Sequence, residues 1–201
     1  MKALIRPAVS LFVALTVVTG VVYPLAVTGV AKTVFPEQAA GSLIVENGKT
    51  VGSSLIGQNF TLKNGDPDPR YFQPRPSNAG DDGYDALASA GSNLGPSNPD
   101  LLATVKHRVI AYRRLNGLAP DASVPVDAVT SSGSGLDPNI SVANAQLQVS
   151  RVARTRGVSD AQVHALVATH TRGRQLGILG ETTVNVLELN LALDALPGQR
   201  R

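Results

Sequence analysis

The sequence predicts an α+β protein: a single N-terminal transmembrane helix followed by one extracytoplasmic globular domain of α/β type. Three observations support this prediction: a long uncharged apolar segment at the N-terminus, an early β-hairpin signal, and several helix start and stop signals in the second half of the chain. We therefore divide the 201 residues into an anchor, residues 1–31, and a globular domain, residues 32–201.

The anchor is predicted from length and charge. From Pro7 to Ala31 the chain carries no charged side chain over 25 residues. About 20 apolar residues span a bilayer core, whereas the apolar region of a signal peptide has about 7–15. The length therefore favours a retained transmembrane helix. A cleaved signal peptide is the alternative, because Gly29-Val30-Ala31 is an acceptable small-x-small cleavage site.

The charges that flank this segment predict its orientation. Lys2, Arg6 and the amino terminus lie on one side, while Lys32 and Glu37 lie on the other. The positive-inside rule places the more basic flank in the cytoplasm. We therefore expect a single-pass protein of the cell membrane with its C-terminal domain outside.

Composition excludes several classes of function. The domain beyond Ala31 has 16 basic and 15 acidic residues, so it is nearly neutral and has no basic face for nucleic acid. The chain has no cysteine, which excludes disulfides, thiolate metal sites and cysteine nucleophiles. It also has no G-x-x-x-x-G-K-[ST] phosphate loop.

The first elements of the domain are predicted as strands. Apolar runs within residues 43–51 surround Asn47-Gly48, the pair favoured in a type I′ hairpin turn. The segment "SLIGQNF", residues 54–60, reads as a next strand, with Gly57 as a bulge.

A helix is predicted over residues 98–116. Asn98 is a good N-cap, Pro99 suits the first helical position, and Gly117 ends the pattern. An apolar face is expected along this helix: Leu102, Val105, Val109 and Tyr112.

Two more helices follow. One is expected over residues 141–156 with Gly157 as its stop, and another begins at Ser159, where Gln162 completes a capping box. Before them, residues 123–138 read as a short strand and a flexible loop. The tail "VNVLELNLALDAL" fits either a strand or a helix, and its Leu and Ala content favours the helix.

One alternative function is a membrane-anchored serine hydrolase. It would use Ser132 or Ser134 as the nucleophile with His164 or His170 as the base. Neither serine lies in a G-x-S-x-G elbow, which weighs against this reading.

A second alternative is a periplasmic cation-binding module that uses Asp81, Asp82 and Asp85. Such an acidic cluster is more often a solvated loop. We assign no catalytic residue, no metal ligand and no bound cofactor to the chain from the sequence.

Five separated segments resemble one known family. They are "YFQPRPS" (71–77), "GSNLGPSNPDL" (91–101), "VTSSGSGLDPNIS" (129–141), "LVATHTRGRQLGILGE" (166–181) and "VNVLELNLALD" (184–194). Together with the single N-terminal span, they resemble the KdpC family, the small single-span subunits of Kdp potassium-transporting P-type ATPases. Asn139 stands where this family usually has histidine.

The resemblance implies a non-catalytic subunit of a four-part potassium pump. Its implied partners are a channel-like potassium-translocating subunit, the catalytic P-type ATPase subunit and a small single-span subunit. The assembled pump uses ATP and Mg²⁺ and transports K⁺. The implied role is to assemble and stabilise the complex, to cap the channel-like subunit and to raise ATP affinity. Because about 30 Å of hydrocarbon separates the outer domain from cytoplasmic nucleotide, we expect any effect on ATP to be indirect.

Within this reading we predict ten partner-contact residues. Small polar side chains and glycines can hold a defined loop that another chain approaches closely. Arginines beside the end of the third helix either complement its dipole or contact a partner. The predicted contact residues are Arg75, Pro76, Ser77, Ser92, Asn93, Pro96, Ser97, Asn98, Arg172 and Arg174.

Overall fold

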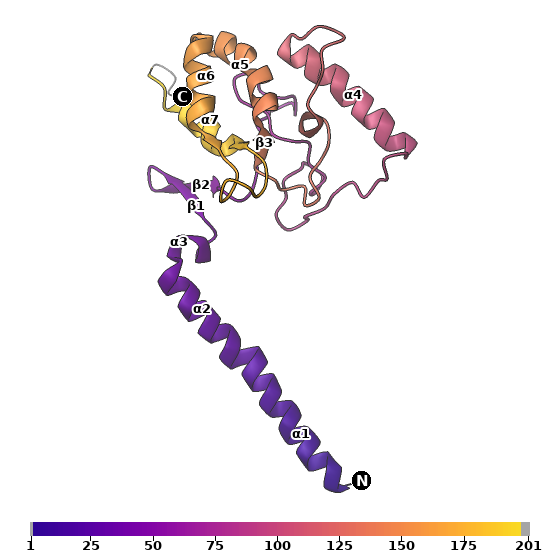
Figure 1. Ribbon diagram of the computed structural model, residues 1–201, viewed down its shortest axis with the longest axis vertical. Helices are drawn as coiled ribbons and strands as arrows, with labels where there is room; N and C mark the ends of the chain where they lie inside the picture. Colours follow the sequence, from indigo (N-terminus) through magenta and orange to yellow (C-terminus); the bar gives the residue numbers. More distant parts are fainter. Residues whose placement is uncertain (1, 198–201) are drawn as a thin grey trace. The chain divides into compact units, whose positions relative to one another are not determined.

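The computed structural model describes residues 2–197, and the chain forms two compact units that divide between Ser53 and Ser54 (Figure 1). The mixture of helices and strands agrees with the predicted α+β class. The elements of the first unit are α1 (Lys2–Val17), the π-helix η1 (Val18–Val22), α2 (Tyr23–Val34), α3 (Pro36–Ala39), β1 (Leu43–Glu46) and β2 (Lys49–Ser53).

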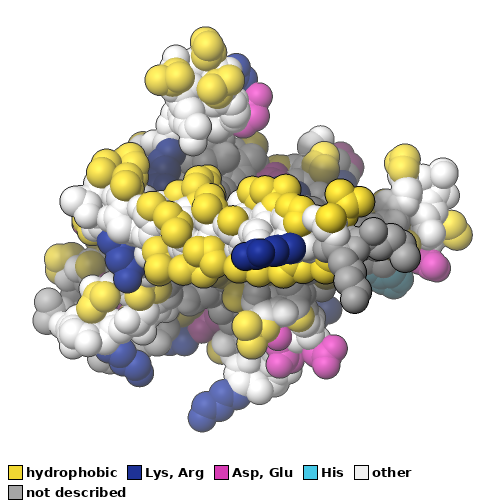
Figure 2. Space-filling view, turned by 90° about the horizontal axis from the view of Figure 1, so that it is seen from below, with side chains coloured by type: hydrophobic (Ala, Val, Ile, Leu, Met, Phe, Trp, Pro, Cys, Tyr) yellow, Lys and Arg dark blue, Asp and Glu magenta, His cyan; other side chains and the backbone are white. Residues whose placement is uncertain are grey.

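The predicted apolar segment forms one continuous helical run, Ala3–Val34, which continues past Ala31. The run is 32 residues long; its most apolar 18-residue stretch has a mean hydropathy of 2.1, and none of that stretch is buried. Hydrophobic side chains cover this run in Figure 2. The π-helical turn directly precedes Pro24, whose missing N–H and ring interrupt the α-helical ladder. The run is long and apolar enough to cross a membrane.

The predicted hairpin is confirmed. Strands β1 and β2 pair antiparallel, and Asn47 and Gly48 have φ of 50° and 76°. Positive φ at both central residues is the requirement of a type I′ turn, which Asn-Gly meets at low cost.

The second unit contains a short sheet and the longer helices of the domain. Its elements are α4 (Pro99–Asn116), the 3₁₀-helix η2 (Val126–Ala128), β3 (Asn139–Ser141), α5 (Val142–Arg156), α6 (Asp160–Thr169), β4 (Thr171–Arg172), β5 (Thr183–Asn185) and α7 (Val186–Asp194). The sheet has the order β3-β5-β4 and both pairings are antiparallel. Ile140 and Val184 face each other across β3 and β5, and both are buried.

The core of this unit lies where α5, α6 and α7 pack together and onto the sheet, a grouping visible in Figure 1. Its members are aliphatic apart from one phenylalanine: Phe72, Ile140, Ala145, Val149, Val152, Ala153, Val163, Val167, Val184, Val186, Leu189 and Leu193. Phe72 comes from a segment without helix or strand, so that segment is part of the core.

The predicted helix ends are confirmed. The side chain of Asn98 accepts hydrogen bonds from the first turn of α4, and Gly117 ends it with a φ of 65°. Ser159 and Gln162 form the expected capping box. The predicted apolar face of α4 is wrong at Leu102, which is 57% exposed. Only the C-terminal end of α4 is buried, because its contact with α5 is made there.

Two predicted strands are absent. Residues 54–60 form a turn, one bridge position at Ile56 and irregular chain; the N–H of Gly57 is donated to the carbonyl of Leu136 in a loop, not to a neighbouring strand. Residues 126–128 form η2, because the Asp127 carboxylate binds the N–H and hydroxyl of Ser141 and pulls this segment onto the start of α5.

The ambiguous tail is a helix from Val186, as favoured, while the residues just before it belong to β5. The switch occurs at Asn185, whose side chain accepts from the N–H of Glu188 and caps α7.

Candidate functional site

The segment of residues 68–77 has no strand partner, yet side-chain amides satisfy the backbone at its middle. Phe72 donates its N–H to Oδ1 of Asn190 at 2.9 Å, and Nδ2 of Asn190 donates to the carbonyl of Phe72 at 2.9 Å. Gln148 makes the same pair of hydrogen bonds with Gln73, at 2.7 and 3.1 Å. Because Asn190 lies on α7 and Gln148 on α5, two helices hold the segment.

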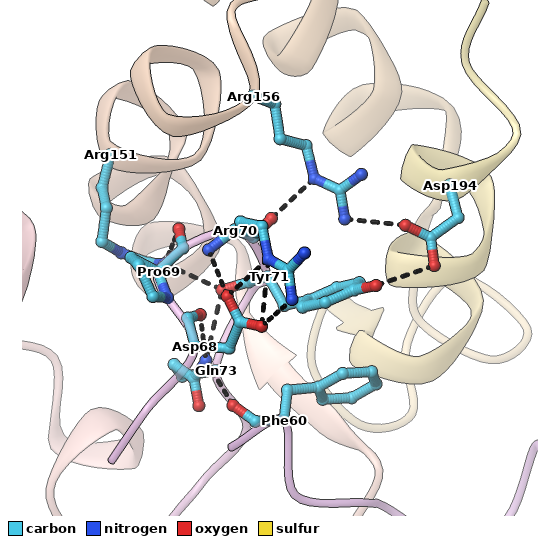
Figure 3. Close-up of polar contacts among 9 residues, drawn as sticks. All are labelled: Phe60, Asp68, Pro69, Arg70, Tyr71, Gln73, Arg151, Arg156 and Asp194. Carbon is cyan, nitrogen blue, oxygen red and sulfur yellow. Dashed lines mark hydrogen bonds and ion pairs between the residues drawn. The ribbon is translucent and has the colours of Figure 1, made fainter. Parts of the chain in front are cut away.

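Arg151 of α5 fastens the start of the same segment (Figure 3). Its side chain is buried, and Nη1 donates to the carbonyls of Pro69 and Tyr71 at 2.6 and 2.8 Å. Nε and Nη2 donate to the amide oxygens of Asn116 and Gln148. Burial lowers the pKa of Arg151 to about 10, so the group stays protonated at neutral pH. Four neutral acceptors therefore hold a buried cation.

A second cluster in Figure 3 joins this segment to α7. Arg156 pairs with Asp194 at 2.8 Å, and the hydroxyl of Tyr71 donates to the other carboxylate oxygen of Asp194 at 3.0 Å. The Arg156 guanidinium lies 4.6 Å from the centre of the Tyr71 ring, which adds a cation–π contact.

Asp68 is buried at the beginning of the segment. Arg70 donates to both of its carboxylate oxygens, at 3.0 Å and 2.6 Å. This hydrogen-bonded guanidinium holds the pKa of Asp68 below its ordinary value and raises that of Arg70.

The end of the segment packs on the loop of residues 129–137. Arg75 forms an ion pair with Asp137 at 3.1 Å and donates to the carbonyls of Thr130 and Ser131. Ser77 donates its hydroxyl to the carbonyl of Gly135 at 2.6 Å. Side chains predicted as partner contacts thus brace two loops within the domain.

The loop of residues 129–137 also packs closely against the chain around Ala90. A Cβ on Gly135, which has a φ of 70°, would lie 2.4 Å from the carbonyl oxygen of Ala90. A Cβ on Gly91 would lie 2.9 Å from the carbonyl oxygen of Gly133. These glycines permit close approach between two loops of one chain, where we had expected approach by another chain.

Comparison with known proteins identifies the family. The model of the family described as "K+-transporting ATPase, c chain" matches residues 5–195. The chain belongs to the KdpC family. A KdpC subunit of Mycobacterium tuberculosis strain H37Rv is 57% identical over 196 residues, covering 98% of this chain and 100% of its own length. Those of Dechloromonas aromatica (58%; 98% and 99%) and Variovorax paradoxus (57%; 100% and 100%) are similar to it over comparable lengths.

The other predicted contact residues of this KdpC-family chain differ in how far they are exposed to solvent. Pro76 and Ser92 are half-buried, and Asn98 is occupied as the cap of α4. Asn93, Pro96 and Ser97 are exposed.

The two arginines near β4 have partners of their own. Arg172 pairs with Glu188 at 2.6 Å, and Arg174 pairs with Glu181 at 2.8 Å. Each guanidinium is directed to a carboxylate.

The alternative catalytic reading finds little geometric support. Oγ of Ser132 lies 3.4 Å from Oγ of Ser134, and Ser134 also accepts from the N–H of Leu136. Within residues 2–197 neither hydroxyl is hydrogen-bonded to an imidazole, and Nδ1 of His170 contacts the carbonyl of Leu166 instead.

The acidic loop is open. Asp81, Asp82 and Asp85 are all exposed, and Asp85 accepts from the N–H of Leu87. In the described part of the chain no three His, Asp or Glu side chains gather in a way that could hold a metal ion.

The polar face of α5 was not predicted from the sequence. Asn144, Gln148 and Arg151 recur at helical spacing and all are buried. Oδ1 of Asn144 accepts a hydrogen bond of 2.9 Å from the hydroxyl of Tyr112 on α4. The spacing of these three residues could have predicted this face, because it places polar side chains on the stripe of the helix that faces the core, where each one requires a hydrogen-bond partner.

Proposed function

We propose that the chain is a non-catalytic subunit of a high-affinity, ATP-driven potassium uptake pump, in which it assembles and stabilises the complex. The observation that carries this proposal is the family match over residues 5–195. Relatives that are 57–58% identical over nearly their whole length are named potassium-transporting ATPase KdpC subunits. The exposed apolar run Ala3–Val34 supports membrane anchorage, since its surface requires lipid or other helices.

The orientation is part of the proposal. Lys2 and Arg6 precede the uncharged segment Pro7–Ala31, so we place the N-terminus in the cytoplasm and residues 32–201 outside. ATP and Mg²⁺ are then used by the catalytic subunit on the opposite side of the membrane. Any effect of this chain on ATP affinity passes through its partners, among which the proposal includes a small single-span subunit.

The outer domain caps the channel-like subunit in this proposal. The domain is nearly neutral, and several of its arginines form ion pairs within the domain. Both features support docking by shape complementarity more than by electrostatic attraction. The exposed loop residues Asn93, Pro96 and Ser97 remain our predicted contacts.

The proposed role in assembly is tested by measuring the activity of the pump together with the mass of the complex. Potassium-stimulated ATPase activity of the purified complex is compared with and without this chain, while the mass of the residual complex is recorded. Separation of the other subunits supports assembly, and an intact complex with lower apparent ATP affinity supports indirect regulation. Unchanged mass and unchanged activity would reject both roles.

Membrane topology is tested separately. Because the chain has no native cysteine, an introduced cysteine is its only thiol that a maleimide can label. Single variants Ala3→Cys and Asp121→Cys, both at exposed positions, are treated with an impermeant maleimide on intact cells. We expect label only at residue 121. Label only at residue 3 would reverse the proposed orientation.

A further inference from the structure

The connection between β4 and β5, residues 173–182, presents large apolar side chains to solvent. Leu176, Ile178 and Leu179 are 88%, 75% and 55% exposed. Scattered exposed apolar residues are ordinary, but three within four positions of one turn form a compact apolar tip. We call Leu176, Ile178 and Leu179 the apolar tip.

The tip has a defined shape. Gln175 and Leu179 pair as an antiparallel bridge, and Gly177 and Ile178 donate their N–H groups to the carbonyls of Arg174 and Gln175, both at 3.1 Å. Leu176 has a φ of 53°, a left-handed conformation that costs energy for a leucine. A preformed loop loses less conformational entropy when it enters a matching pocket.

The base of the loop carries no unmatched cation. Arg174 is neutralised by Glu181, and Arg172 by Glu188 of α7. Attachment to an anionic lipid surface uses free Lys and Arg beside apolar residues. A neutral, preformed apolar tip instead matches a neutral apolar pocket on a protein.

We propose that the apolar tip inserts Leu176 and Ile178 into an apolar pocket on the extracytoplasmic surface of another subunit of the K⁺-transporting ATPase. This inference rests on the proposed function, which supplies the partner and the side of the membrane. It adds three apolar side chains to the ten contact residues predicted from the sequence, in the loop that also carries Arg174.

The first test is retention in the complex. The variant Leu176→Ser/Ile178→Ser of the full chain is expressed with the other pump subunits and purified through a tag on one of them. We expect the retained fraction after dilution to fall about tenfold, the size of loss typical of truncating central interface anchors. Leu87→Ser is the matched control, because Leu87 is 97% exposed in a different loop, and its retention stays at the wild-type level.

The outcomes separate the two proposals. Wild-type chain that fails to purify with the other subunits rejects the proposed function and this inference together. Wild-type chain that is retained while the double variant is retained equally rejects only the inference. Equal thermal midpoints of the double variant and wild type, measured on the isolated chain in detergent, show that reduced retention does not come from unfolding.

A second test identifies the neighbour of the tip directly. A photo-crosslinking amino acid replaces Leu176 in one variant and Leu87 in another, within the assembled complex in membranes. A protein cross-link from position 176 with none from position 87 supports the docking surface. A cross-link from position 176 to lipid alone, or to nothing, overturns it.

Discussion

The side-chain amide of Asn190 serves Phe72 as a neighbouring β-strand would, accepting its N–H and donating to its carbonyl, both at 2.9 Å. Gln148 does the same for Gln73 from another helix. An irregular segment can therefore cross the core with its backbone paired, which a buried segment requires.

We expect Asn190→Leu and Gln148→Leu each to lower the free energy of unfolding by about 2–4 kcal/mol. Asn190→Leu leaves two backbone groups of the buried Phe72 without these partners, and Gln148→Leu does the same at the half-buried Gln73 and removes one acceptor of the buried Arg151. Urea unfolding of the full chain in detergent, followed by circular dichroism, measures the loss. Gln146→Leu, at a half-buried position on the same helix, is the control. Losses no larger than that of the control would contradict the assigned role of the amides.

The ion pair of Asp68 and Arg70 predicts a pH dependence. Because the pKa of Asp68 is lowered in the folded state, the unfolded state binds more protons between the folded and unfolded pKa values. The contribution of the pair is complete above about pH 4 and is lost as the pH falls through the folded pKa.

Asp68→Asn should therefore lower the free energy of unfolding by about 1–3 kcal/mol at pH 7. The difference from wild type should shrink as the pH falls below about 4, since the wild-type carboxyl is then protonated first in the unfolded state and, at lower pH, in the folded state. Urea titrations from pH 2.5 to 7 measure it. A difference that stays constant over this range would show that the charge of Asp68 contributes nothing.

Gly57 lies against the ring of Tyr84. A Cβ there would be 2.3 Å from Cε1 of Tyr84 and 3.0 Å from the carbonyl oxygen of Asp137. We expect Gly57→Ala to destabilise the chain by about 1–3 kcal/mol through overpacking. Gly95→Ala, which meets no atom within 4 Å, is the control, and Tyr84→Ala in the same chain should relieve most of the loss. Thermal unfolding of the four proteins gives the comparison.

Arg75, which we predicted as a partner contact, forms internal contacts with the loop of residues 129–137. We expect Arg75→Gln to cost about 1–3 kcal/mol of stability, and Asp137→Asn to add little to it, because the two changes remove one ion pair. A double-mutant cycle by urea unfolding checks the coupling. Full stability of Arg75→Gln would show that Arg75 does not brace this loop.

Asn98 was predicted both as a helix cap and as a docking residue. Capping alone predicts that Asn98→Ala lowers stability by about 1 kcal/mol, while Asn98→Asp keeps it, since Asp caps equally well. Thermal midpoints measure capping, and retention in the purified complex measures docking. Loss of retention in Asn98→Asp at unchanged stability would establish a separate docking role.

Elements with local signals were predictable from the sequence. The apolar run, the Asn47-Gly48 turn, the cap at Asn98 and the capping box at Ser159 depend on residues only a few positions apart. Their geometry follows from backbone preferences and from hydrogen bonds within one turn.

Relations between distant segments were decided only by the tertiary structure. The partners of Phe72, Tyr71 and Arg75 lie far along the chain, at Asn190, Arg151 and Asp137. Residues 54–60 resemble a strand in composition but form only a turn, one bridge position and irregular chain, and the apolar tip becomes visible only when the fold leaves it uncovered. The sequence by itself thus determined the apolar run, the helix ends and the family motifs. Which side chains face inward depended on packing among segments far apart in the chain, which local preferences do not encode.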